Sequence, residues 1–428
     1  MDEVVGSRKI RWMTSIGAGL LIAASGQAGA ATSSLSGGID NRYSDNARRA
    51  ATNEQSDLET RINLNYGYLS DPGQCTSSVN MGLGYGYWHD DAFDSEVYTN
   101  GTLRGQCELA TGFVWQASNR ISQVTRDSRL ADTQDNLTRR NVFRTGPIYS
   151  LRLTPVDQLQ FSAAYERTDF DKSSEPDSDR FTGTVAYNRT FSETLQGGVS
   201  VSAERTELDT GQELDRESAV VTYNKIWATT RISGSLGVNR LESRFGNQTF
   251  TSDGVTGTFN LVRDITPNSE FTLYADRRLT DQTNILSLEF EDFNFNLAES
   301  AAVEVTAIRA GYNVQFSNGS RFRTGLSASR SDYVQTGVRE ERSGIDFGYS
   351  RPVTELLSWF TDASLQHWRF ENDGREDYLA SLAAGLNYQL STRMDIRSTV
   401  GHRQKTSDIA AREYDENWVV VSLNYQFF

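Results

Sequence analysis

The last twelve residues of the chain, 417–428, read NWVVVSLNYQFF and decide the fold. Their alternation divides a β-strand into a polar face of Ser422, Asn424 and Gln426 and an apolar face of Val419, Val421, Leu423, Tyr425 and Phe427. The mean hydropathy of the whole chain is −0.53, so an apolar ending would leave a water-soluble protein with a sticky tail. The pattern predicts instead the last strand of a β-barrel lying in a lipid bilayer.

The same alternation recurs along the chain. It is clear in the segments 80–88 (NMGLGYGYW), 308–316 (IRAGYNVQF) and 382–390 (LAAGLNYQL). The polar face is rich in Gly, Ser, Asn, Thr and Gln, whereas exposed strands of a soluble β-sandwich would more often carry Lys and Glu. The segments run for about 10–14 residues, longer than sandwich strands and long enough to cross a bilayer at a tilt. We therefore expect the apolar face to point outward, to lipid.

Two kinds of connection separate these segments. Short turns are expected near 70–74, 107–110, 154–157, 191–194, 225–228, 265–268, 317–320, 352–355 and 390–393. Longer acidic loops are expected at 169–179, 204–217 and 371–377. Nine short turns predict an all-β fold, a single antiparallel up-and-down transmembrane barrel of about 20 strands, with 18 as the alternative. The first strand is expected near 34–46, and an enlarged loop at 283–300 would fold inward or extend the strands.

The N-terminus has the pattern of a secretory signal peptide. Arg8, Lys9 and Arg11 precede an apolar run at 13–25, and Ala28-Gly29-Ala30 forms a small-x-small site. The run is too short for a membrane anchor. We expect residues 1–30 to be cleaved and 31–428 to form the barrel. The net charge of −14 disfavours nucleic-acid binding and suits an exported protein.

The chain contains two cysteines, Cys75 and Cys107. They are equally distant in sequence from Asp91, the expected centre of one long loop, so they should face each other across a hairpin near its short-turn end. Opposed residues in a strand pair are close enough for a disulfide, and the compartment outside the inner membrane is oxidising. We predict a structural bridge, which titration of free thiols would test.

Tryptophans are expected at both rims of the barrel, as girdles at the two water interfaces. Trp227 and Trp359 fall at short turns. The prediction places Trp88, Trp368 and Trp418 at the opposite rim, whereas Trp115 lies within a strand and fits a girdle least.

Two stretches of sequence resemble a known family. Ser44-Asp45-Asn46 and Ser56-Asp57 flank the first expected loop, and the chain closes on AREYDENWVVVSLNYQFF. This layout resembles the outer-membrane β-barrel porin 2 family, which is often associated with exopolysaccharide-production loci. The resemblance implies a location in the cell outer membrane and passage or export of a polysaccharide, and it supplies no catalytic residues. The tail, with Tyr425, Phe427 and Phe428, is similar to the C-terminal signal that the barrel-assembly machinery recognises. In that signal the last residue is usually the outward aromatic, whereas here the outward series ends at Phe427 and Phe428 is one residue out of phase. Either the strand has one extra residue at its end or a bulge restores the phase.

Chemistry is expected in the lumen. The three histidines, His89, His367 and His402, have no serine motif beside them, so we predict no enzyme, and no pattern indicates a cofactor or a metal site. Strand parity places five arginines on the inner face: Arg152, Arg231, Arg309, Arg323 and Arg397. They would attract anions such as acidic sugars, or they would brace the wall by pairing with carboxylates such as Asp346 or Asp395. The leading hypothesis is a channel in contact with outer-membrane lipid and lipopolysaccharide. The alternatives are a non-conducting scaffold that presents loops or docks a periplasmic partner and, third, a barrel enzyme.

Overall fold

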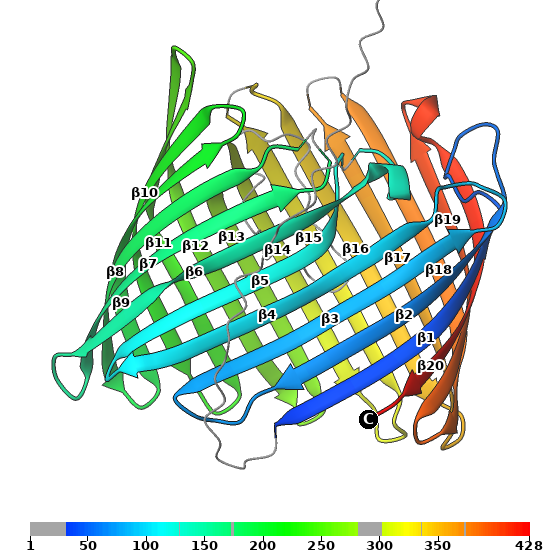
Figure 1. Ribbon diagram of the computed structural model, residues 1–428, viewed down its shortest axis with the longest axis horizontal. Coiled ribbons are helices and arrows are strands. Elements are labelled where there is room, and N and C mark those ends of the chain that lie inside the picture. The colour runs from blue at the N-terminus through cyan, green and yellow to red at the C-terminus, as the bar shows by residue number, and fades with distance from the viewer. Residues whose placement is uncertain (1–30, 128, 173–174, 281–301, 335, 372–373) are drawn as a thin grey trace, which may run out of the picture.

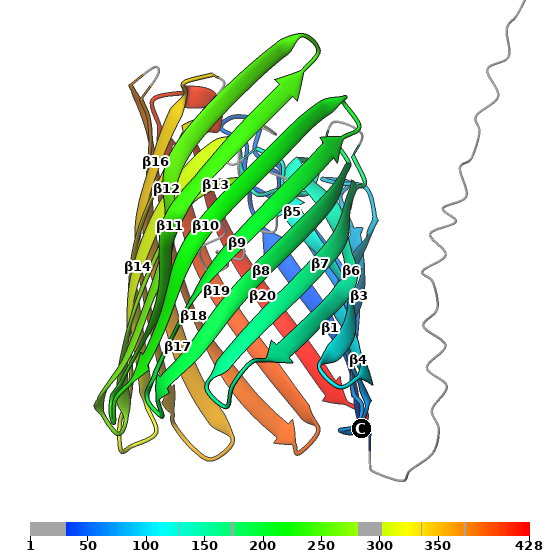
Figure 2. The ribbon, with the colours of Figure 1, turned by 90° about the vertical axis from the view of Figure 1, so that its left-hand side faces the viewer.

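The computed structural model describes residues 31–127, 129–172, 175–280, 302–334, 336–371 and 374–428. These residues form one antiparallel sheet of 20 strands that closes on itself as a barrel (Figures 1 and 2). The first and last strands complete the closure through a register that runs from Ser36 opposite Gln426 to Ser44 opposite Trp418. The predicted all-β barrel of about 20 strands is confirmed, and the expected loop at 283–300 lies outside the described residues.

The strands follow one another around the barrel in chain order. The first ten are β1 (Thr32–Ser44), β2 (Asp57–Leu69), β3 (Cys75–Trp88), β4 (Glu96–Ala110), β5 (Phe113–Thr125), β6 (Leu137–Arg152), β7 (Asp157–Phe170), β8 (Ser178–Ser192), β9 (Leu195–Leu208) and β10 (Gln212–Ile226). The other ten are β11 (Thr230–Phe245), β12 (Gln248–Thr266), β13 (Ser269–Thr280), β14 (Val303–Gln315), β15 (Arg321–Tyr333), β16 (Arg339–Pro352), β17 (Leu357–Phe370), β18 (Arg375–Ser391), β19 (Met394–Ser407) and β20 (Tyr414–Gln426). Two short 3-10 helices, η1 (Gln134–Asn136) and η2 (Ala410–Arg412), lie in loops. Among the described residues, no helix has the length and apolar character to cross a membrane.

Nine connections of two to five residues gather at one end of the barrel, which we call the short-turn end; the other is the loop end. All nine lie at or within a few residues of the predicted turns. The loop predicted at 204–217 is wrong, because β9 and β10 continue through it and leave only 209–211 as a turn. Alternation persists in this acidic stretch, so the two strands continue as a paired hairpin up to the turn (Figure 2).

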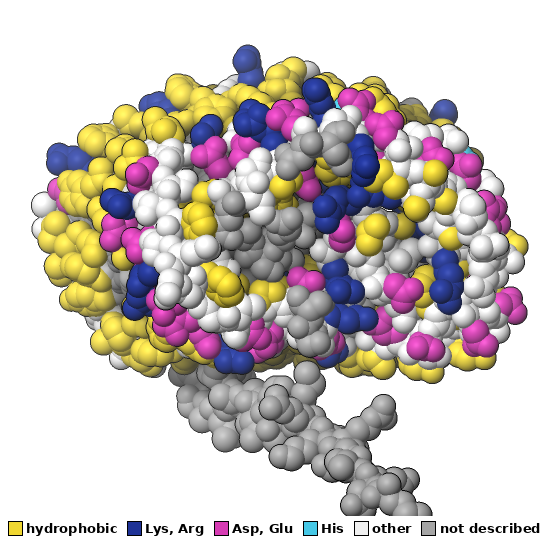
Figure 3. Space-filling model, turned by 90° about the horizontal axis from the view of Figure 1, so that it is seen from above, with side chains coloured by type: hydrophobic (Ala, Val, Ile, Leu, Met, Phe, Trp, Pro, Cys, Tyr) yellow, Lys and Arg dark blue, Asp and Glu magenta, His cyan; other side chains and the backbone are white. Residues whose placement is uncertain are grey.

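The outer surface of the barrel is apolar. Leu236 is 65% exposed and Val201 62% exposed, although both lie in the middle of long strands. In β3, Leu83 and Tyr85 point outward while the glycine between them, Gly84, is buried. Viewed from above, hydrophobic side chains surround a charged and polar centre (Figure 3). The exposed surface therefore fits a lipid environment rather than water.

The C-terminal tail is ordered by its pairing with β1. The register of β20 against β1 is unbroken as far as Gln426. Beyond it, the Phe427 amide donates to the Leu35 carbonyl (2.8 Å) and the Leu35 amide donates to the Phe428 carbonyl (3.0 Å). The phase offset of Phe428 thus comes from one residue past the strand, and no bulge interrupts this pairing.

Three tryptophans depart from the predicted girdle. Trp88 is 7% exposed and packs on Phe93 inside the loop end, and the register puts Trp418 opposite Gly401 and Trp368 opposite Asp377, on the inner face. Their phase matches that of the inward residues of their strands, which decides their direction.

The tryptophan that fitted a girdle least lies on the outer face. Trp115 is 45% exposed, and its indole nitrogen donates to the Thr145 hydroxyl (3.0 Å). It lies in the short-turn half of the barrel, opposite Cys107. A strand position near the rim therefore serves as well as a turn for an interfacial indole.

Candidate functional site

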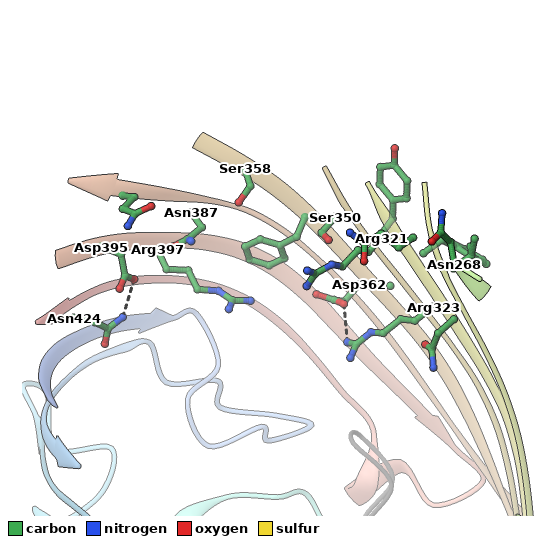
Figure 4. A pocket seen from close by; sticks show the side chains of 18 of the residues that line it. Asn268, Arg321, Arg323, Ser350, Ser358, Asp362, Asn387, Asp395, Arg397 and Asn424 are labelled. Atoms are coloured by element: carbon green, nitrogen blue, oxygen red, sulfur yellow. Dashed lines mark hydrogen bonds and ion pairs between the residues drawn. The ribbon is translucent and has the colours of Figure 1, made fainter. Parts of the chain in front are cut away.

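A cavity of about 1440 Å³ lies in the lumen at the short-turn end, against the inner face of strands β12 to β20 (Figure 4). Its wall is built mainly from amide, hydroxyl and charged side chains, because the inward phase of each strand carries them. Amides come from β14, β18, β20 and the turn between β12 and β13: Asn268, Asn313, Gln315, Asn387, Gln389, Asn424 and Gln426. This is a hydrated wall able to form hydrogen bonds with a polar solute.

The five arginines predicted for the lumen take three positions. Arg323 and Arg397 line the large cavity, from β15 and β19. Arg309 on β14 and Arg231 on β11 have inward phase on the same side of the barrel. Arg152 on β6 lines a separate cavity of about 390 Å³. The structure therefore does not arrange the arginines as one ring: four lie on the side of the large cavity, and Arg152 lies apart from them.

Three of these arginines pair with carboxylates. The atoms of the ion pairs are 3.1 Å apart for Arg309 and Asp346 and 2.9 Å apart for Arg323 and Asp362. Arg231 lies 3.7 Å from Glu270. Each pair joins two strands that have one strand between them, so the pairs brace the wall and cancel part of the positive charge, as the bracing alternative expects for Arg309.

Two strand arginines of the large cavity are left without carboxylate partners, and Arg393, in the turn after β18, likewise forms no ion pair with the residues that the structure describes. Neither Arg397 nor Arg321, which sequence reasoning missed, forms an ion pair with any residue that the structure describes. Arg397 lies over the Phe360 ring, 4.1 Å from its centroid. Asp395, expected as a pairing candidate, accepts a hydrogen bond from Asn424 instead (3.1 Å). The cavity thus keeps positive groups that can meet an anionic solute. The inward parity of Arg321 in β15 was the sequence signal that could have identified it.

The loop end of the lumen is packed. The Glu416 carboxylate, on a side chain 1% exposed, contacts the guanidinium groups of Arg42 and Arg49 and accepts a hydrogen bond from Ser44 (2.9 Å). Further round the wall, Arg180 lies 3.0 Å from Glu166, and both side chains are buried. These networks fill the interior where the short-turn end is open.

Residues 126–136 reach across the loop end and contact distant strands. The Lys405 ammonium of β19 donates to the Arg129 carbonyl (2.7 Å) and lies 3.0 Å from Asp377. Arg49 donates to the Asp132 carbonyl. We call residues 126–136 the crossing loop; it narrows the mouth, and no feature of the sequence distinguished it from the other loops.

The three histidines lie away from the lumen. His89 is 3.0 Å from Thr60, and His402 is 2.9 Å from Asn417, on the outer face. His367 stacks on Tyr378. Within the described ranges no group of acidic, histidine or cysteine side chains is arranged to hold a metal ion.

Cys75 and Cys107 are joined as a disulfide across β3 and β4, directly opposite in register. They occupy outward positions at the short-turn end, in phase with Leu103. The bridge therefore fixes the lipid-facing wall and takes no part in the lumen.

With the barrel and its lumen described, comparison with known proteins becomes informative. Residues 345–427 match the family described as putative beta-barrel porin 2. The chain is an outer-membrane β-barrel with the fold of channels and transporters. By the usual orientation of such barrels, the short-turn end faces the periplasm.

Solved structures with a similar fold share little sequence. The FrpB iron transporter of Neisseria meningitidis is 10% identical, with 92% of this chain and 82% of that one covered and a TM-score of 0.47. OpdK of Pseudomonas aeruginosa, solved with vanillate, is 10% identical over 92% and 99%, with a TM-score of 0.40. The siderophore receptor PiuA of Acinetobacter baumannii is 10% identical over 94% and 82%, with a TM-score of 0.46. No curated protein matches the chain.

Proposed function

We propose that the protein is an outer-membrane channel for hydrophilic solutes, with saccharides that carry carboxylates as the favoured class. The observation that carries the proposal is the polar cavity of about 1440 Å³ with two strand arginines, Arg321 and Arg397, and a turn arginine, Arg393, that form no ion pair with the described residues. Amides around them can exchange hydrogen bonds with sugar hydroxyls, and a guanidinium can bind a carboxylate through two parallel hydrogen bonds. No catalytic step is part of the proposal.

The crossing loop sets the size of what passes. Its contacts with Lys405 and Arg49 hold it over the lumen, so an extended chain would pass more readily than a compact solute of the same mass. Passage of a polymer is consistent with the polysaccharide association that the family resemblance implies.

Conductance across a planar bilayer tests the channel directly. The purified barrel should give steps of defined size, and a salt gradient should give a reversal potential that favours anions. A barrel that never conducts would reject the channel. It would favour the second candidate, a non-conducting scaffold, which the packed interior of the loop end supports.

Replacing the two unpaired strand arginines tests the role of the wall. Arg321→Gln with Arg397→Gln should lower the anion-to-cation permeability ratio roughly threefold, as about 0.7 kcal/mol of lost attraction would. The matched control is Arg263→Gln, whose side chain faces outward near the same end. Equal selectivity in the double variant and the control would contradict the assignment of Arg321 and Arg397.

A further inference from the structure

Ion pairs on the outer face are concentrated on one side of the loop end. From β6 to β18 the outward positions above the apolar band, or the loops that follow them, carry ion pairs, which we call the outer belt: Arg139–Asp171, Arg167–Asp169, Arg205–Asp215, Arg240–Asp253, Arg277–Glu304, Arg330–Asp332 and Arg339–Glu371. From β19 through β1 to β2, the same level instead has hydrogen bonds, such as Thr60 to Asn41 (2.8 Å) and Asn417 to Asp45 (2.7 Å). The outer belt therefore offers cationic groups on one side of the barrel only.

A groove of about 320 Å³ interrupts the outer belt across β14, β15, β16 and β17, which follow one another in the wall (Figure 1). Its floor includes Thr306, Ile308 and Ala328. Ala328 is paired with Ile308 on one side and Ser343 on the other, so small side chains create the hollow. The groove continues downward into the apolar band, where Leu326 and Leu365 are exposed.

Basic side chains predominate at the upper rim of the groove. Arg330, His367 and Arg369 line it with a single carboxylate, that of Glu341. Arg330 is held 2.9 Å from Asp332, and His367 lies 3.4 Å from Glu376.

Arg369 differs from the other rim residues. It is exposed, and it makes no hydrogen bond or ion pair with any residue in the described part of the chain. A free guanidinium thus lies directly above an apolar hollow on the lipid-facing surface. Such a site fits a molecule with an anionic head at the water interface and a hydrocarbon chain in the membrane.

We propose that this groove binds a phosphorylated glycolipid of the outer leaflet, the lipopolysaccharide that faces the loop end of an outer-membrane barrel. Arg369 and Arg330 receive the phosphate, and one acyl chain lies on Ala328 and Ile308. A phosphate presents several oxygens to a guanidinium fork, which a neutral headgroup does not. The site is on the outer face and does not depend on conduction through the lumen.

Binding of lipid A to the purified barrel in detergent, followed by native mass spectrometry, tests the proposal. Arg369→Gln with Arg330→Gln should weaken binding of bisphosphorylated lipid A about tenfold, while the native barrel should bind dephosphorylated lipid A correspondingly weakly. The matched control is Arg240→Gln, an outer-belt arginine that does not line the groove, which should bind like the native protein. All variants are first checked for folding by heat-modifiable mobility on gels.

A second variant tests the hollow itself. Ala328→Trp fills the groove without changing charge and should weaken lipid A binding to a similar degree. The proposal fails if both groove variants bind like the control. It also fails if phosphatidylethanolamine binds as tightly as lipid A, since the groove would then be an unselective lipid contact.

Discussion

Glu416 and Asp395 are inward carboxylates near opposite ends of neighbouring strands, and their surroundings differ completely. Glu416, at the loop end, is buried among arginines. Asp395, at the short-turn end, lines an open cavity and meets only an amide of Asn424 among the described residues. The loop end uses inward charges to pack the interior, and the short-turn end leaves them in water for a solute to meet. The difference teaches that inward parity alone does not identify a functional group, because burial decides what the charge does.

Neutralising Glu416 should produce the largest effect. Glu416→Gln leaves the buried Arg49 and the partly exposed Arg42 without their counter-charge and should destabilise the barrel by about 3 kcal/mol. Urea unfolding followed by tryptophan fluorescence would measure it. The matched change in the cavity, Asp395→Asn, should cost less than about 1 kcal/mol. Similar losses in both variants would remove the distinction between the two ends.

The disulfide supports the end that lacks buried ion networks. Replacing Cys75 and Cys107 by Ser should lower the free energy of unfolding by about 2–4 kcal/mol. The measurement is the same urea unfolding, with and without reductant. Thiol titration of the unfolded, unreduced native protein should find no free thiol, and two free thiols would refute the bridge.

Releasing the crossing loop should have a moderate effect. Lys405→Met removes a charged hydrogen bond to the Arg129 carbonyl, worth about 1.5–3 kcal/mol, and should loosen the loop. It also removes the ion pair with the buried Asp377, which keeps Arg412 at 3.8 Å and the hydrogen bond from Ser407. Single-channel recording should show larger or more frequent openings. Lys225→Met, at the short-turn end on the outer face, is the control. Unchanged conductance in Lys405→Met would mean that the loop does not limit passage.

The smallest expected effect concerns pH. Partial burial acts to raise the pKa of Asp127 in the crossing loop, but hydrogen bonds from Arg129 outweigh it and hold the pKa below its ordinary value of 3.8. Because the pKa of Asp127 is lower in the folded protein than in the unfolded chain, the ionised carboxylate stabilises the crossing loop fully at pH values well above 3.8. This stabilisation is lost as the pH falls through the lowered pKa of the folded state. Open-channel noise should therefore rise below about pH 4 and be insensitive to pH in Asp127→Asn. Noise independent of pH in the native channel would contradict this role.

The barrel fold could be predicted from the sequence because alternation and turns are local signals. Nine turns and the strand number follow from residues within a few positions of one another, and the outward phase of Leu83 or Val421 follows from parity. The resemblance to the porin 2 family was likewise visible in the last hairpins, and it is confirmed over residues 345–427.

The interior could not be read in the same way. Contacts such as Lys405 with the Arg129 carbonyl join residues far apart in sequence, and nothing in residues 126–136 marks them as the loop that crosses the mouth. Which arginines pair also depends on how far a side chain reaches over the adjacent strand. Arg323 on β15 reaches over β16 to Asp362, whereas Arg397 lies over the ring of Phe360. The tryptophan girdle failed for Trp88 because position along a strand was considered without its phase.

Closure of the barrel joins the beginning of the described chain to its end, with Leu35 hydrogen-bonded to both terminal phenylalanines. Until synthesis and export are complete, the first strand has no partner on one side. The growing sheet therefore carries an open edge throughout its delivery, and another copy of the chain would satisfy that edge equally well. Pairing of β20 with β1 ends this exposure, so the strand that closes the barrel also protects the chain against aggregation.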